Sequence, residues 1–183
     1  MDIQHSMAVK IAAWIDGKEI KEETERICLI YGIEVFLNEF LKIAVSWMIA
    51  MVLGVFPLVV FGTVYLLLLR RYAGGRHFES NVACFIFSIF TLVIVPFAGL
   101  KIDFPLVVQI GSVLIEIILF FIYAPSKVTI SILERDRWRR KIKTLAVYLI
   151  GLFLSWIIGK ESYVNVMLLM GLIVAIATIE KRR

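Results

Sequence analysis

Residues 43–69 read IAVSWMIAMVLGVFPLVVFGTVYLLLL, a stretch of 27 residues without a charged side chain. A helix that crosses the hydrocarbon core of a bilayer needs about 20 such residues, so this stretch is long for one crossing and short for two. Gly54 and Pro57 lie near its middle, and a Gly/Pro pair is typical of a tight turn. We therefore predict a hairpin of two membrane helices over residues 33–69; the alternative is a re-entrant segment.

Further apolar stretches follow on the C-terminal side. They cover residues 82–100, 104–124, 142–159 and 162–179. The whole chain of 183 residues is 61% hydrophobic and 19% charged, whereas soluble domains are about 45–50% apolar and about 25% charged. The predicted fold class is therefore all-α, a polytopic integral membrane protein with about six transmembrane helices. Two cysteines and four prolines exclude a disulfide scaffold and a Pro-rich linker.

The first 32 residues differ from the rest because their apolar side chains are spaced rather than continuous. Met7, Ile11 and Trp14 recur at helical spacing, and a second apolar set follows the break at Asp16-Gly17. This pattern predicts two amphipathic helices within residues 1–32. They lie either on the membrane surface or against loops of the same protein. We expect this segment to be retained, since it has no continuous apolar core of the signal-peptide type.

Positive charge is unevenly distributed between the connections. If both termini face the cytoplasm, 18 of the 20 lysines and arginines lie on the cytoplasmic side, and Lys101 and Lys160 lie outside. Cytoplasmic connections of membrane proteins carry such an excess. We therefore predict a multi-pass protein with both termini in the cytoplasm. Because the basic residues flank apolar segments, they indicate contact with membrane lipid and not with nucleic acid.

The connection between the second and third spans, residues 70–81, carries the candidate chemistry. It reads RRYAGGRHFESN and leads to Cys84 at the edge of the next apolar stretch. A cysteine thiolate is a nucleophile, and a neighbouring imidazole is the usual base that generates it. His77 and Cys84 are therefore candidate catalytic residues. The alternative is an interfacial histidine and a buried apolar cysteine.

Geometry limits how these two residues can meet. In one straight helix the Cα atoms of His77 and Cys84 would be about 10.5 Å apart, too far for side chains that must approach within about 3 Å. A working pair therefore needs His77 outside the helix, on a Gly-Gly loop whose backbone adopts angles that other residues avoid. Ser80 or Asn81 can cap the helix that follows, although either could instead orient the imidazole. Cys84 then falls in or just beyond the first turn, where the helix dipole favours a thiolate.

The order of these residues resembles a known family. Arg70-x-x-x-Gly74-Gly75-x-His77, followed by Cys84 at the start of a span, is similar to AgrB, the accessory gene regulator protein B of Gram-positive quorum sensing. Tyr31-Gly32 before the first span and Ala124-Pro125 after the fourth also match that family. The resemblance covers nearly the whole chain.

The resemblance implies one peptidase domain over residues 1–183, a membrane-embedded cysteine endopeptidase of the bacterial cell membrane. Its substrate would be an AgrD-like propeptide with an amphipathic leader, a central signal sequence and an acidic tail. Cys84 would attack the carbonyl at the junction with the tail, and His77 would act as base and then as acid. A cysteine or serine of the substrate would then attack the thioester and close a thiolactone or lactone ring. The resemblance implies no cofactor and no metal.

Other polar residues have two interpretations each. Arg70 holds substrate or anchors its span at the lipid headgroups. Glu116 and Gln109, seven residues apart in the fourth span, contact substrate or form hydrogen bonds between helices, since polar groups inside a membrane are costly. Cys28 and His5 have no partner at a useful spacing. The polar segment 125–143 binds anionic lipid or docks the acidic tail of the substrate, through Arg135, Arg137, Arg139, Arg140, Lys141 and Lys143.

The competing class is a non-enzymatic membrane protein, either a small transporter or a metal carrier. Transporters often contain internal repeats, and none is visible in this sequence. A metal site needs three or four ligands, and only His77 and Cys84 lie near each other. The enzyme interpretation is therefore favoured. Small membrane proteins of this kind commonly pair, so a homodimer is possible.

Overall fold

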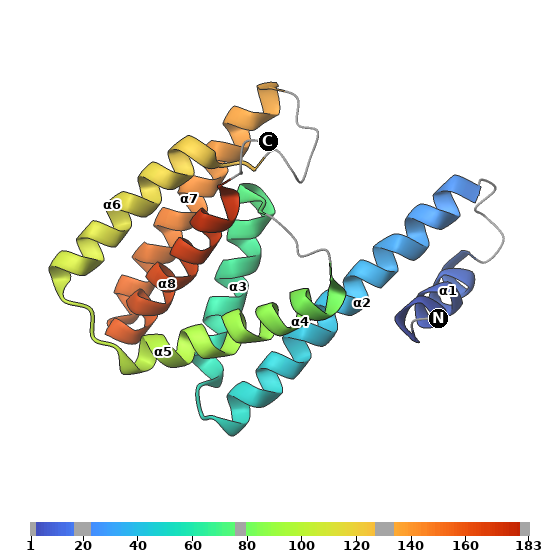
Figure 1. Cartoon of the computed structure of the whole chain (residues 1–183), viewed down its shortest axis with the longest axis horizontal. Helices are drawn as coiled ribbons and strands as arrows, with labels where there is room; N and C mark the ends of the chain where they lie inside the picture. The colour runs from blue at the N-terminus through green and yellow to red at the C-terminus, as the bar shows by residue number, and fades with distance from the viewer. Residues whose placement is uncertain (1–2, 17–22, 76–79, 127–133, 180–183) are drawn as a thin grey trace. The chain divides into compact units, whose positions relative to one another are not determined.

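The computed structural model describes residues 3–16, 23–75, 80–126 and 134–179, and every regular element in these ranges is a helix. Six helical segments of the described part are long and apolar enough to cross a membrane: α2, α3, the continuous segment from α4 through α5, α6, α7 and α8. The all-α architecture with six spans that the sequence predicts is confirmed. Figure 1 shows the elements, which are α1 (Ile3–Asp16), α2 (Glu23–Val52), α3 (Phe56–Ala73), α4 (Asn81–Ile89), the π-helix η1 (Phe90–Ile94), α5 (Val95–Lys101), α6 (Leu106–Tyr123), α7 (Glu134–Ile158) and α8 (Glu161–Thr178).

The chain falls into two compact units, Met1–Val45 and Ser46–Arg183. The first unit contains α1 and the greater part of α2. Ala8 and Ala12 lie on one face of α1 and are completely buried. His5 Nδ1 of α1 contacts Glu34 Oε1 of α2. The sequence gives His5 no partner because this contact joins residues 29 positions apart.

The start of α2 differs in one detail from the sequence expectation. The second apolar set of residues 1–32 does not form a separate amphipathic helix, because α2 begins at Glu23 and continues to Val52. Gly32 is its only glycine, and a single glycine costs a helix about 1 kcal/mol. The helix propensities of the other residues of α2 offset this free-energy cost. The helix of the first span therefore begins with charged turns, which start at Glu23 and precede its apolar part.

A tight turn joins α2 to α3, as the Gly/Pro pair predicts. Gly54 has φ +69°, and the N–H groups of Gly54 and Val55 donate to the carbonyls of Met51 and Ala50 at 3.2 and 3.0 Å. These paired bonds around a left-handed residue form a Schellman motif, in which glycine avoids a steric penalty. Pro57 then lies in the first turn of α3, where its missing N–H has no cost. The predicted hairpin of two helices is confirmed.

The third span contains a π-helical turn. Phe90–Ile94 is π-helical, and Pro96 occupies the first turn of the following α5. A proline inside an α-helix lacks the N–H for the i−4 carbonyl and clashes with that carbonyl. The wider π turn accommodates both effects while the span stays helical.

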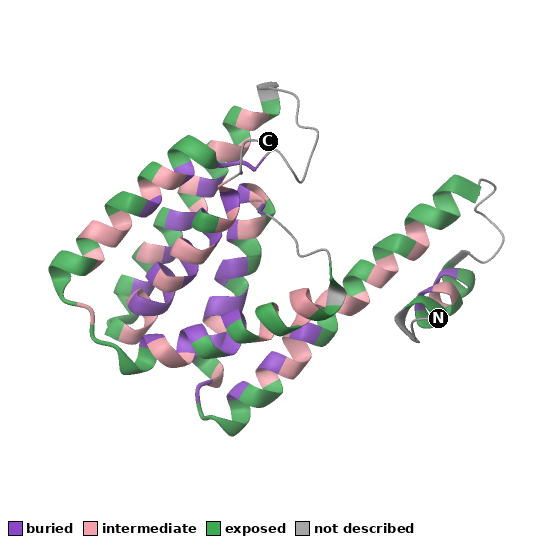
Figure 2. Cartoon of the chain, viewed as in Figure 1, coloured by how far each residue is buried: buried purple, intermediate pink, exposed green. Residues whose placement is uncertain are grey.

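Helix α8 is the centre of the second unit, where it packs against α3, α5, α6 and α7. Figure 2 shows buried residues along α8 and along α3, with exposed residues on the outer surface of α6. Glycines let these helices approach closely: a Cβ at Gly99 of α5 would lie 2.8 Å from Val166 Cγ2, and one at Gly62 of α3 would lie 2.8 Å from Met170 Cε. Close packing at small residues is a main source of helix association in lipid, where hydrophobicity does not distinguish neighbours.

Candidate active site

Cys84 lies at the end of the first turn of α4. Its backbone N–H donates to the carbonyl of Ser80 at 2.9 Å, and Ser80 Oγ accepts from the N–H of Ala83 at 3.4 Å. Ser80 is therefore the N-cap, as one of the two sequence alternatives predicts, and Asn81 is the first helical residue. The predicted position of Cys84 next to a helix start is confirmed. The positive end of a helix dipole favours a thiolate at such a position.

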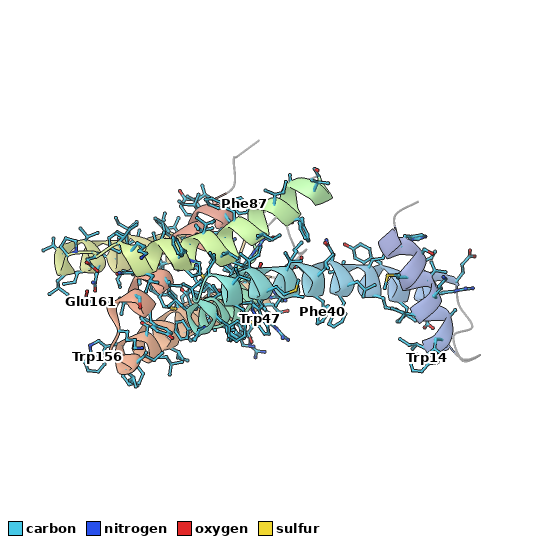
Figure 3. The ribbon with its side chains drawn as sticks, turned by 90° about the horizontal axis from the view of Figure 1, so that it is seen from below. Trp14, Phe40, Trp47, Phe87, Trp156 and Glu161 are labelled. Atoms are coloured by element: carbon cyan, nitrogen blue, oxygen red, sulfur yellow. The ribbon has the colours of Figure 1, made fainter. Side chains whose placement is uncertain are left out.

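Apolar side chains precede and follow Cys84 along α4. Its side chain is half-buried, while Val82, Ile86 and Phe87 of the same helix are exposed. Figure 3 shows Phe87 on the surface of α4. In a chain that crosses a membrane, exposed side chains of this kind face lipid. Cys84 therefore lies at the border between a polar connection and an apolar helix.

The histidine of the predicted pair, His77, lies in residues 76–79, outside the part of the chain that the structure describes. The described residues on each side define the ends of this connection. On one side is Gly75, and on the other is Ser80.

The Gly-Gly pair ends α3 in backbone conformations that side-chained residues rarely adopt. Gly74 has φ +73° and ψ −150°, and Gly75 has φ +141°. The N–H of Gly74 donates to the carbonyl of Arg70 at 2.9 Å. A positive φ is the region where glycine has an advantage over other residues, which agrees with the backbone argument from the sequence. A Cβ at position 75 would lie 3.9 Å from Nη2 of Arg70.

The two arginines before the Gly-Gly pair differ in their surroundings. Arg70 is half-buried and directs its guanidinium toward Gly75, whereas Arg71 is exposed. The headgroup-anchoring interpretation therefore suits Arg71 better than Arg70.

The basic cluster forms the beginning of α7, which starts at Glu134. This corrects the expectation of a loop over residues 125–143, since only residues up to 133 precede the helix. Arginine and lysine are good helix formers, and an apolar span follows them directly. Lys141 Nζ lies 4.8 Å from the ring centroid of Phe121 and 5.9 Å from that of Trp138. Lys143 Nζ lies 5.5 Å from the ring centroid of Tyr72.

The remaining members of the cluster stay accessible to different degrees. Arg139 is exposed, and Arg137 and Arg140 are half-buried. The Arg135 side chain lies outside the described residues. Aromatic contacts of the two lysines fix the start of α7 against the ends of α3 and α6, and such cation–π contacts contribute about 0.5–1 kcal/mol each at exposed sites.

The sequence of this chain is similar to proteins of one known family. The profile of the accessory gene regulator B family matches residues 8–179. This range includes most of α1 and all of α2 to α8. The chain belongs to the accessory gene regulator B family.

Several staphylococcal members of this family are similar to the chain. Accessory gene regulator protein B of Staphylococcus carnosus is 30% identical over 155 residues, which is 83% of this chain and 81% of that protein. The protein of the same name from Staphylococcus aureus strain JH9 is 29% identical, over 87% of this chain and 86% of that protein. The one from Staphylococcus saprophyticus is 27% identical, over 85% of this chain and 82% of that protein. No solved structure matches the chain.

Family membership and the six apolar helices together define the coarse role of the protein. It is a multi-pass membrane protein of the accessory gene regulator quorum-sensing system. The relatives share most of its length, so this role applies to the chain as a whole.

The fourth span of this AgrB-family chain contains a carboxyl group at its centre. Glu116 of α6 is completely buried and faces Tyr148 of α7 and Gly171 of α8, whose missing side chain leaves room for the carboxyl group. None of these oxygens forms a regular hydrogen bond within the described part of the chain. Glu116 therefore lies in the packing between α6, α7 and α8, and within the described residues it forms none of the interhelical hydrogen bonds that one of its two interpretations expects.

Gln109 and Asn165 are the other polar amides of the bundle that have a defined role. Gln109 Nε2 donates to the carbonyl of Phe104 at 2.9 Å, just before the start of its own helix α6. Asn165 Nδ2 donates to the carbonyls of Gly99 and Ile102 at 3.3 and 2.7 Å, and it thereby joins α8 to the end of α5. Asn165 was missed among the sequence candidates, although a polar residue inside an apolar stretch is a signal in itself.

A cavity of about 470 Å³ opens at the ends of the helices opposite to the Gly-Gly pair. It lies between the start of α6 and the turn from α7 to α8, and its lining includes Trp156 and Glu161. Figure 3 shows Trp156 pointing away from the bundle beside this turn. An exposed tryptophan at a span end is typical of the membrane interface. Cys84 is not among the residues that line this cavity.

Proposed function

We propose that this protein is a membrane-embedded cysteine endopeptidase that matures a quorum-sensing propeptide. Cys84 is the nucleophile and His77 is the general base. The substrate is an AgrD-like propeptide with an acidic C-terminal tail. The single observation that supports this best is the position of Cys84 in a chain of the accessory gene regulator B family. It lies at the capped start of a membrane helix, after a short connection from the glycine-ended α3 whose sequence includes His77.

The first step is acyl transfer to the enzyme. His77 takes the proton of Cys84, and the thiolate attacks the carbonyl at the junction between signal sequence and tail. The C–N bond breaks, and the tail leaves as an amine after it receives the proton from His77. The rest of the propeptide stays on Cys84 as a thioester.

The second step closes the ring. A cysteine or serine within the bound peptide attacks the thioester, the bond to Cys84 breaks, and the proton returns to the Cys84 sulfur through His77. Transfer between two thiols is nearly neutral in free energy, whereas hydrolysis would end the reaction irreversibly. The exposed apolar side chains of α4 beside Cys84 support this scheme, because helix faces of this kind lie in lipid, where the access of water is limited.

The basic start of α7 is the proposed dock for the acidic tail. Arg137, Arg139 and Arg140 are at least partly accessible, and they lie on the helix that follows the fourth span. With both termini in the cytoplasm, as the charge distribution predicts, this surface and the Gly-Gly loop belong to the cytoplasmic side. Anionic lipid is the competing ligand of the same charges.

Co-expression with the propeptide tests the proposed function. We expect mass spectrometry of the purified protein to detect a thioester adduct on the peptide that contains Cys84, with a mass equal to leader plus signal sequence. We also expect the free acidic tail and the cyclic product. A metal carrier or transporter would leave the propeptide uncut, and such a result would contradict the proposal. The described part of the chain contains no group of three His, Cys, Asp or Glu residues that could hold a metal ion.

A further inference from the structure

Glu116 is an ionisable residue that the proposed reaction does not use. It lies in the middle part of α6, which is one of the six apolar helices long enough to cross a membrane. Its side chain is completely buried, and neither carboxyl oxygen has a hydrogen-bond partner among the described residues. A carboxyl group inside a membrane is costly, and such groups commonly have a function.

Three helices meet at this carboxyl group, since α6 packs against both α7 and α8 (Figure 1). A Cβ at Gly171 of α8 would lie 2.2 Å from Glu116 Oε2 and 3.1 Å from Tyr148 Cε2 of α7. The carboxyl group and the tyrosine ring therefore border the same point on α8. The Tyr148 hydroxyl is buried too, and it has no hydrogen-bond partner within the described part of the chain.

The ionisable groups around Glu116 supply no positive charge. Neither ion pair found in the described ranges includes Glu116. The last basic residue of α7 is Lys143, five residues before Tyr148, and its Nζ lies 5.5 Å from the centroid of an aromatic ring of α3. In α8 the charged residue is Glu161, in the first turn. The core around Tyr148 contains a second phenol, Tyr65 of α3, whose hydroxyl is likewise unpaired among the described residues.

The missing positive charge limits the state of the carboxyl group. A carboxylate that is buried without a cation or hydrogen-bond donors costs far more free energy than the neutral acid does. A metal cation needs several oxygen ligands and room for them, whereas Gly171 packs directly on Glu116 Oε2. A proton needs no added volume. It is therefore the ligand that best fits this position.

We propose that Glu116 binds a proton in the interior of the membrane, and that this proton allows α6 to pack against α7 and α8. The neutral acid has one O–H donor, for which the unpaired Tyr148 hydroxyl is an available acceptor. Loss of the proton leaves a negative charge where three helices meet, and it weakens their packing. The site does not involve Cys84 or His77, so this inference does not rest on the proposed function.

Infrared spectroscopy of the full chain in a detergent without ester groups tests the bound proton. Neutral carboxylic acids and ionised carboxylates absorb in separate bands. We expect the parent at neutral pH to show an acid band that Glu116→Gln lacks. Glu161→Gln is the matched control, because Glu161 is exposed, and we expect it to keep the band. A parent spectrum with no acid band beyond that of Glu116→Gln overturns the inference.

Thermal unfolding across a range of pH tests whether the proton supports the packing. Glu116→Gln replaces the acid by a neutral group of similar size, so we expect the unfolding temperature at neutral pH to stay close to that of the parent. As the pH rises and the acid band disappears, we expect the parent to lose stability relative to Glu116→Gln, because only the parent has a proton to lose at this site. A constant difference between the two proteins while the band disappears overturns the packing role.

Gly171→Ala tests the location of the site. The added Cβ would overlap Glu116 Oε2 and force the carboxyl group to move, so we expect the unfolding temperature to fall by at least about 2 °C. In a Glu116→Ala background the same substitution meets no carboxyl group, and we expect a smaller fall. An equal fall in both backgrounds shows that the carboxyl group is not beside Gly171 and overturns the proposed site.

Discussion

The two cysteines of the chain lie in different surroundings, and this difference leads to the clearest prediction at the residue scale. Cys28 is exposed in the early turns of α2. Cys84 is half-buried and lies where the capped start of α4 favours a thiolate. His77 is close to Cys84 in sequence and far from Cys28. We therefore expect the sulfur of Cys84, and not that of Cys28, to act as a nucleophile.

We predict that Cys84→Ala and His77→Ala each abolish cleavage of the propeptide, and that Cys28→Ala leaves it unchanged. The first removes the nucleophile and the second removes its base. Cleavage is measured by gel mobility of a tagged propeptide in membranes. Loss of cleavage with Cys28→Ala, together with normal cleavage by Cys84→Ala, would contradict the site assignment.

Gly75 gives a second prediction at the same scale. Valine at this position should reduce propeptide cleavage by about tenfold or more with the protein still inserted in the membrane, because φ +141° is strained for a β-branched residue. Gly32→Val is a control for the introduction of valine itself, since a Cβ at Gly32 meets nothing within 4 Å. Cleavage at the parental rate by a well-expressed Gly75→Val protein would exclude a role for this backbone conformation.

At the scale of elements, close contacts at glycine decide how the helices pack. Gly99 of α5 meets the α8 backbone, and a Cβ there would lie 3.1 Å from the N atom of Val166. Backbone atoms of a packed helix cannot rotate away as the end of a long side chain can. A Cβ at Gly111 of α6, by contrast, would meet nothing within 4 Å. The two glycines look alike in sequence and differ only in their neighbours.

We therefore predict opposite outcomes for alanine at these two positions. Gly99→Ala should destabilise the protein by about 1–3 kcal/mol because it overpacks the contact between α5 and α8. Gly111→Ala should be neutral or stabilise by up to about 1 kcal/mol, because alanine favours helix. Thermal unfolding in detergent measures both. Equal stability of the two variants would show that α5 and α8 do not pack in this way.

At the scale of the whole molecule, the asymmetry of positive charge links topology to substrate capture. Most basic residues lie in the segments that the sequence places on the cytoplasmic side, and the strongest cluster begins α7. The same charges can set the orientation of the spans and attract an acidic tail. A test must therefore separate these two effects.

We predict that joint reversal of Arg137, Arg139, Arg140 and Lys141 to glutamate reduces propeptide cleavage strongly, whereas each single reversal has little effect. Surface charge pairs contribute only about 0–1 kcal/mol each, so only the sum is large. Added salt should reduce cleavage by the parent in the same direction, because screening acts over about 8–10 Å near physiological ionic strength. The measurement is the cleavage rate at several salt concentrations.

Two controls separate docking from topology. A reporter fused to the C-terminus establishes whether the reversed protein keeps its orientation. A propeptide whose acidic tail residues are changed to lysine should be cleaved better by the reversed protein than the native propeptide is. If the reversed protein keeps its topology and cleaves the native propeptide at the parental rate, the cluster does not dock the tail and anionic lipid remains its ligand.

Features that depend on local composition could be predicted from the sequence alone. The lengths of the apolar stretches predicted the six spans, Gly54 and Pro57 predicted the hairpin, and Ser80 predicted a cap near Cys84. Each of these follows from a few neighbouring residues, because span length, turn conformation and capping are set within a few turns of chain. The candidate catalytic residues also came from one short motif, although residues 76–79 lie outside the described structure.

Which surfaces meet depends on the tertiary structure. Ser126 bonds to the end of α3, Asn165 joins α8 to the end of α5, and Glu116 lies between α6, α7 and α8. Asn165 and Ile102 are 63 positions apart in the chain, and no local pattern encodes such a partner. The cause is that lipid is as apolar as the faces of the helices, so hydrophobicity places a helix in the membrane but does not select its neighbour. Which helices become neighbours is decided by close packing at glycines and by the few buried polar groups.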